Sequence, residues 1–227
     1  MIGAIRRFVQ YDVRSYSTTI GKWMLAKADN LGIATPDIIY GFGDRWLRLV
    51  STTPTEEAHA VADVLYREYE PDSVIDFGCG LGRYLTGFQA HGAAVHGVEG
   101  FSEARGYAEI PADALTIHDL REPLELDERY DLALCIETAE HIPSRFADTL
   151  VETVTAAAPR VVFTAAPPGH RGTHHVNEAP REYWIEKFQA QGFSYAPEET
   201  DRLQKSVRSE IEAAEWVADR PFIFVQD

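Results

Sequence analysis

Two carboxylates and a histidine lie close together in the run Glu137-Thr-Ala-Glu140-His141-Ile-Pro, directly after a predicted buried strand. Glu137, Glu140 and His141 are spaced i, i+3 and i+4, so one helical turn would bring their side chains to the same side. A second polar segment, residues 172–178, follows the next predicted strand and contains His175. Because neighbouring parallel strands end at one sheet edge, we expect two carboxylates and two imidazoles to converge.

Three interpretations of this group remain open. In the first, the group binds a divalent cation that lowers the pKa of an acceptor hydroxyl. A mixed carboxylate and imidazole set suits Mn, Fe, Co or Zn better than Mg. In the second, no metal binds and His141 or His175 acts as a general base. In the third, Glu140 and His141 cap the helix and pack the floor of the site.

A glycine-rich loop forms a second candidate site between two predicted strands. Its residues of interest are Asp76, Gly78, Cys79, Gly80 and Gly82. Glycines let the backbone turn tightly and approach a ligand closely, and the successive amides of residues 78–82 can bind an anion. Glu99 ends the following strand, where an acidic side chain can accept two hydrogen bonds from a ribose diol. The pair of features predicts a nucleotide-like ligand.

The elements that must position these residues alternate along the chain. Predicted strands lie at 74–75, 95–98, 114–117, 130–136, 161–165 and 221–225. Predicted helices include one that begins with a capping box at Thr53 to Glu56, and others at 146–157, 180–192 and 203–211. Strands alternating with helices indicate βαβ units, so we expect an α/β fold with a doubly wound, mostly parallel sheet.

Residues 1–54 differ from the remainder in their aromatic and arginine-rich character. We interpret them as an N-terminal extension that either forms a lid or substrate arm or packs against the outside of the core. The predicted organisation is therefore an extension over residues 1–54 followed by a catalytic domain over residues 55–227.

Composition narrows the classes of function. The chain has 227 residues and a net charge of −15, which disfavours a general nucleic-acid binder because such proteins carry a basic face. It has two cysteines, Cys79 and Cys135, in positions that suit neither a metal motif nor a disulfide framework. No apolar run is long enough to span a membrane. We expect a cytoplasmic protein.

The glycine loop with Asp76 before it resembles motif I of the class I S-adenosylmethionine (SAM) methyltransferases, and the resemblance extends over residues 73–143. The Glu-x-x-Glu-His run is similar to one in the ubiquinone-biosynthesis O-methyltransferases and in the small-RNA 3′-terminal 2′-O-methyltransferases. The resemblance implies a Rossmann-like fold, SAM as the cofactor and a small-molecule hydroxyl as the methyl acceptor. The alternatives are a nucleic-acid 2′-O-methyltransferase and a non-catalytic protein that binds SAM or NAD.

The resemblance also implies roles for individual residues. The cofactor would be held by Asp76, Gly78, Cys79, Gly80, Gly82, Glu99, Asp119 and Leu120, with Asp119 and Leu120 at the adenine. A divalent metal, which would be Mg, Mn, Fe or Zn, would be held by Glu137, Glu140, His141 and His175. The catalytic residues would be His141, Glu140 and His175.

Overall fold

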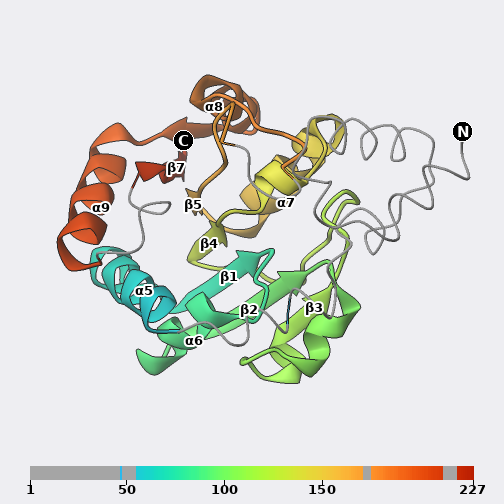
Figure 1. Ribbon diagram of the computed structural model, residues 1–227, viewed down its shortest axis with the longest axis vertical. Coiled ribbons are helices and arrows are strands. Elements are labelled where there is room, and N and C mark those ends of the chain that lie inside the picture. Colours follow the sequence, from blue (N-terminus) through green and yellow to red (C-terminus); the bar gives the residue numbers. More distant parts are fainter. Residues whose placement is uncertain (1–46, 48–54, 171–174, 212–218) are drawn as a thin grey trace, which may run out of the picture.

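The computed structural model describes Leu47 and residues 55–170, 175–211 and 219–227. These residues form one mixed sheet of seven strands covered by helices on both faces (Figure 1). The strands are β1 (Ser73–Phe77), β2 (Ala94–Glu99), β3 (Leu115–Ile117), β4 (Leu132–Cys135), β5 (Arg160–Phe163), β6 (Phe193–Tyr195) and β7 (Phe222–Gln226). The helices are α5 (Glu56–Tyr69), α6 (Arg83–Ala90), α7 (Ala147–Ala157), α8 (Arg181–Ala190) and α9 (Pro197–Glu210).

The sheet has the strand order β3-β2-β1-β4-β5-β7-β6. Strands β1 to β5 pair in parallel, whereas β7 runs antiparallel to both β5 and β6. The order reverses between β1 and β4, and ligands of such sheets bind where the carboxyl ends of these strands diverge. The predicted doubly wound α/β fold, with a mostly parallel sheet, is confirmed.

Alternation along the central strands divides the core between the two faces of the sheet. Leu132 and Leu134 of β4 belong to one cluster with residues of α5, α6 and α9, whereas Ala133 and Cys135 belong to another with residues of α7 and α8. Figure 1 shows α5 beside α9, and these two helices are also in contact. Because successive strand residues point to opposite faces, alternate residues of β4 pack against the helices on the two sides of the sheet.

Two element boundaries differ from the sequence prediction. Helix α5 begins at Glu56 with Thr55 at its N-cap, so the predicted capping box starting at Thr53 is wrong. The backbone oxygen of Thr55 accepts from the N–H of His59, while the Thr55 side chain makes no capping hydrogen bond. Helix α9 begins earlier than expected, at Pro197, because proline suits the first helical position.

Strand β6 was not predicted from the sequence. It has only three residues, which are too few to show the alternation of apolar and polar residues typical of a strand. It is defined by its pairing with β7. Of the predicted N-terminal extension, the structure describes Leu47, which is fully buried in the core cluster that contains Val61 and Leu65. Among the described residues, no helix is both long and apolar enough to cross a membrane.

Candidate active site

The loop after β4 is joined to the segment after β5 through the backbone of Glu140. Its carbonyl oxygen accepts hydrogen bonds from the N–H groups of Val176 and Asn177, at 2.9 and 3.0 Å. Glu140 itself belongs to a short 3₁₀ helix, Ala139–His141. This connection places His175 beside Glu140, as the convergence of the two strand ends predicts.

Glu140, His141 and His175 form a compact group in which one potential ligand atom from each lies within 4.8 Å of the others. The Nε2 atom of His175 is 3.9 Å from Oε1 of Glu140. The imidazole rings of His141 and His175 meet edge to face, with centroids 5.1 Å apart. A carboxylate and two imidazoles at this spacing match the donor set of a divalent transition metal.

The Glu140 carboxylate is fully buried, and neither of its oxygens has a hydrogen-bond partner among the described residues. Burial, together with the charge of the nearby Glu137 carboxylate, raises the pKa of Glu140 to about 8, while Arg220 opposes the shift. A buried carboxylate without a partner is costly, so this group needs a proton, a cation or a ligand.

Glu137 does not belong to that group of three, although its carboxylate lies near that of Glu140. It follows β4 with φ of +50°, a left-handed conformation unusual for a residue with a side chain. Its Oε1 accepts from the Thr164 hydroxyl at 2.9 Å and its Oε2 from Nη1 of Arg220 at 3.2 Å. The predicted single helical turn does not form, because the helical residues begin only at Ala139.

His175 is buried and has a carboxylate near each of its ring nitrogens. Its Nδ1 lies 3.6 Å from Oε1 of Glu178, and its Nε2 faces Glu140. Glu178 is itself fixed, because its Oε2 accepts from the N–H of Gly169 at 2.9 Å. A carboxylate on the Nδ1 side favours a proton there and leaves Nε2 able to accept a proton or bind a metal.

The glycine loop turns through three left-handed residues, Gly78, Gly80 and Gly82, with φ of +77°, +57° and +77°. The expected anion nest does not form. The amides of Gly78 and Cys79 donate to the carbonyl of Val98, and the Gly82 amide donates to that of Cys79. The Cys79 side chain is buried towards Gly97, so only its backbone lies in the loop.

Two buried acids support the loop. Glu99 accepts from the N–H of Gly80 at 2.8 Å and from that of Phe101 at 3.1 Å. Burial raises the pKa of Glu99, and these backbone N–H groups oppose the shift. Burial and the Glu99 charge together raise the pKa of Asp76 to about 8. Both acids lie at the strand ends where the sequence places them.

Thr138 lies between the glycine loop and the group formed by Glu140, His141 and His175. A Cβ atom on Gly78 would lie 2.2 Å from the Thr138 hydroxyl oxygen. Only glycine allows this approach, and Thr138 stands two residues before Glu140. The close contact therefore brings the two candidate sites together at the carboxyl ends of β1 and β4.

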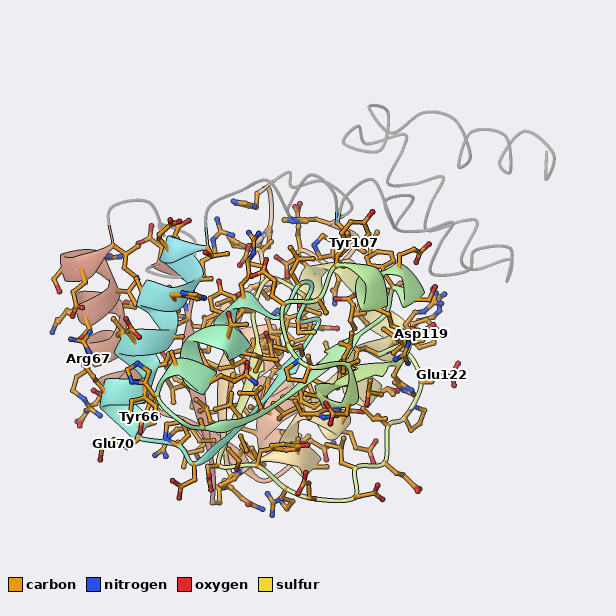
Figure 2. The ribbon with its side chains drawn as sticks, turned by 90° about the horizontal axis from the view of Figure 1, so that it is seen from below. Tyr66, Arg67, Glu70, Tyr107, Asp119 and Glu122 are labelled. Carbon is orange, nitrogen blue, oxygen red and sulfur yellow. The ribbon has the colours of Figure 1, made fainter. Side chains whose placement is uncertain are left out.

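Asp119 and Leu120 lie after β3. Figure 2 shows Asp119 at one side of the molecule, near Glu122. Both Asp119 oxygens contact the Arg121 guanidinium, at 2.9, 3.0 and 2.6 Å. Burial raises the pKa of Asp119, but the Arg121 hydrogen bonds outweigh it and lower the pKa below its ordinary value. Leu120 is buried in the core cluster of α7 and α8.

Sequence reasoning missed Arg220, Thr164 and Thr138. Thr138 lies inside the Glu-x-x-Glu-His run, and this position was the one feature of the sequence that pointed to it. Thr164 directly follows β5, and Arg220 lies two residues before β7, where no local pattern marks a site residue. His174, which the sequence places next to His175, lies outside the described residues.

Comparison with known proteins shows the family of the chain. A family model described as a methyltransferase domain matches residues 51–200. No curated protein matches the chain. The fold is similar to magnesium protoporphyrin IX methyltransferase from Synechocystis PCC 6803, with a TM-score of 0.54 at 16% identity over 99% of each chain.

Two further solved structures share the fold. One is an amino pentose methyltransferase of calicheamicin biosynthesis from Micromonospora echinaspora, with a TM-score of 0.57 at 15% identity, over 78% of this chain and 93% of that one. The other is a sugar N-methyltransferase from Streptoalloteichus sp ATCC 53650, with a TM-score of 0.55 at 16% identity, over 75% and 86%. The chain therefore belongs to the methyltransferase domain family and is a class I SAM-dependent methyltransferase with a Rossmann-like sheet.

Proposed function

We propose that the protein transfers the methyl group of SAM to a hydroxyl of a small molecule, with a divalent metal at Glu140, His141 and His175. The observation that carries this proposal is the fully buried Glu140 carboxylate, which has no hydrogen-bond partner among the described residues and lies beside two imidazoles. The close approach of Thr138 to Gly78 places this group near the glycine loop. Donor and acceptor sites would thus be adjacent.

The SAM site would lie over the glycine loop. Glu99 keeps acceptor capacity beyond its two backbone contacts, because a carboxylate offers about four lone-pair positions, so it can also receive a ribose diol. The loop residues Gly78, Cys79, Gly80 and Gly82 would contact the amino-acid end, with Asp76 nearby. Asp119 and Leu120 remain the proposed adenine neighbours, and the first must then share its carboxylate with Arg121.

The donor set fits a metal. Glu140, His141 and His175 supply one oxygen and two nitrogens, and the buried Glu140 carboxylate would supply the charge that a cation neutralises. When bound, such an ion lowers the pKa of a coordinated hydroxyl. Glu178 lies on the Nδ1 side of His175, at 3.6 Å, and the Nε2 atom of the ring faces Glu140.

A metal-free mechanism is the second candidate, and the position of Glu178 favours it equally. With a proton at Nδ1 on the side of Glu178, the Nε2 atom of His175 would take the proton of an acceptor hydroxyl. The sulfonium already activates the methyl group, so positioning of the acceptor supplies much of the rate in either mechanism.

A small-molecule acceptor is supported by two features. The chain is acidic, with a net charge of −15, which opposes RNA as a substrate. Two proteins of the same fold are methyltransferases of small acceptors, a magnesium porphyrin and an amino pentose. We propose the same class of acceptor here, in place of a nucleic acid, and a cytoplasmic location.

Calorimetric titration tests the proposal directly. SAM is titrated into chelator-treated protein, then into protein with added Mn²⁺, and NAD is titrated in parallel. We expect SAM to bind in both preparations and Mn²⁺ to bind with a measurable heat. Mn²⁺ binding by the wild type and its loss in His175→Asn would support the metal mechanism, whereas SAM binding without any Mn²⁺ heat would support the general base. NAD binding without SAM binding would overturn the proposal.

A further inference from the structure

Arg220 connects two segments of the proposed site from outside it. The residue lies just before β7, and its side chain is mostly buried. Its Nη1 donates to Oε2 of Glu137 at 3.2 Å, and its Nη2 contacts Nε2 of His170. One guanidinium therefore bridges the loop after β4 and the segment after β5.

The contact of Arg220 with His170 is linked to the proposed metal ligands through the His175 ring. The rings of His170 and His175 stack, with centroids 5.6 Å apart and planes inclined by 14°. His175 in turn meets His141 edge to face. A movement of His170 would therefore be transmitted to the ring that faces Glu140.

The contact of Arg220 with Glu137 helps to fix the direction of the Glu137 side chain. Thr164 and Arg220 engage both oxygens of the Glu137 carboxylate, and the Glu137 N–H also donates to the Thr164 hydroxyl at 2.7 Å. These three contacts hold Glu137 in its left-handed backbone conformation. The group of potential ligands found among the described residues contains Glu140, His141 and His175 without Glu137.

We infer that Arg220 is a positioning residue, which holds the Glu137 carboxylate out of the metal-ligand set and braces His170 against His175. The inference rests on the proposed function for its metal, but the positions of the side chains do not depend on it. Arginine suits this role because its planar guanidinium presents several donors in a fixed fork on separate nitrogens, whereas the three donors of lysine all lie on one nitrogen.

Nuclear magnetic resonance of the histidine rings in the metal-free full-length protein tests the bracing. Ring signals of His170 and His175 are assigned by loss in His170→Asn and His175→Asn. In Arg220→Gln we expect both signals to shift, and in Arg220→Lys the His170 signal to shift as well. Arg67→Gln, which removes an exposed ion pair with Glu210, is the matched control and should shift neither. An unchanged His175 signal in Arg220→Gln would overturn the bracing role.

Titration with Co²⁺ alone tests the position of Glu137. We expect Glu137→Gln to bind Co²⁺ within threefold of wild-type affinity, with the same visible spectrum, whereas His175→Asn loses at least tenfold. Arg220→Gln should change the spectrum, because Glu137 is then released, and Glu137→Gln in that background should restore it. A tenfold loss in Glu137→Gln alone would return Glu137 to the ligand set and overturn the inference.

The two experiments separate the inference from the proposed function. If wild-type protein binds no Co²⁺, the metal mechanism fails, and the ring signals still decide whether Arg220 braces His170 and His175. If Co²⁺ binds and the ring signals do not respond to Arg220→Gln, the metal mechanism stands and the bracing role of Arg220 fails.

Discussion

The carboxylate of Glu140 lies 3.9 Å from Nε2 of His175, although the two residues belong to segments that follow different strands. Backbone hydrogen bonds from Val176 and Asn177 to the Glu140 carbonyl hold them together. The contact therefore depends on the pairing of β4 with β5 and on the local backbone, not on the imidazole itself. Substitution of either side chain should leave the fold in place.

Glu140→Gln should weaken Mn²⁺ binding at least tenfold, because it removes the one carboxylate of the three proposed ligands. SAM affinity should change less than twofold, since Glu140 is not among the proposed SAM contacts. Calorimetric titration of each ligand separates the two effects. Glu152→Gln, an exposed position on α7, is the control for a general loss of negative charge. Equal Mn²⁺ affinities in Glu140→Gln and wild type would refute the metal assignment.

Much of this arrangement could be predicted from the chain. The Glu-x-x-Glu-His run and the later His175 give the members of the site, and the alternation of strands and helices predicts their meeting at one sheet edge. The position of Glu137 could not be predicted, because i, i+3, i+4 spacing brings side chains together only on a helix, and here the helix begins after Glu137. Arg220 could not be predicted either, since an antiparallel pairing of β7 with β5 brings it to the site.

The anion nest fails for a related reason. Glycine spacing predicts a tight loop, and the loop forms with three left-handed glycines. The spacing does not say which acceptors the amides reach. Val98 and Cys79 supply backbone carbonyls, and Glu99 supplies a carboxylate, within hydrogen-bonding distance of these amides.

Glu99→Gln should weaken SAM binding, because it removes the charged acceptor proposed for the ribose diol. Loss of a hydrogen bond to a charged group costs about 1.5–3 kcal/mol, so we expect Kd to rise roughly tenfold or more. Glutamine keeps one oxygen for the Gly80 amide and preserves the loop better than alanine would. Calorimetry measures the affinity, with the partly buried Glu103→Gln as control. An unaltered Kd would remove Glu99 from the ribose site.

Gly78→Ala should destabilise the fold more than Gly92→Ala. Both residues have positive φ, +77° and +90°, so both variants carry the strain of a left-handed alanine. Only at Gly78 would the new Cβ also meet Thr138, at 2.2 Å, whereas a Cβ at Gly92 has nothing within 4 Å. We expect an additional loss of about 1–3 kcal/mol in the free energy of unfolding. Urea denaturation of the two variants gives this difference directly, and equal losses would show that Thr138 moves aside without cost.

Asp76→Asn should stabilise the protein at pH 8.5 relative to wild type, and much less at pH 5. Burial, with a contribution from the Glu99 charge, raises the pKa of Asp76 from about 3.8 in the unfolded chain to about 8 in the fold. The folded state then binds a proton that the unfolded state releases between these values, so the contribution of Asp76 to stability is present below pH 4 and is lost as pH rises towards 8.

Asparagine does not titrate, so its difference from wild type isolates this group from every other ionisation. A shift of four pKa units corresponds to a few kcal/mol, on the order of 1.4 kcal/mol per unit. Urea unfolding of both proteins at the two pH values measures the change. If the difference between Asp76→Asn and wild type is the same at pH 5 and pH 8.5, the pKa of Asp76 is not raised in the folded protein. Asp76 would then be ionised in the fold at both pH values, in spite of its burial.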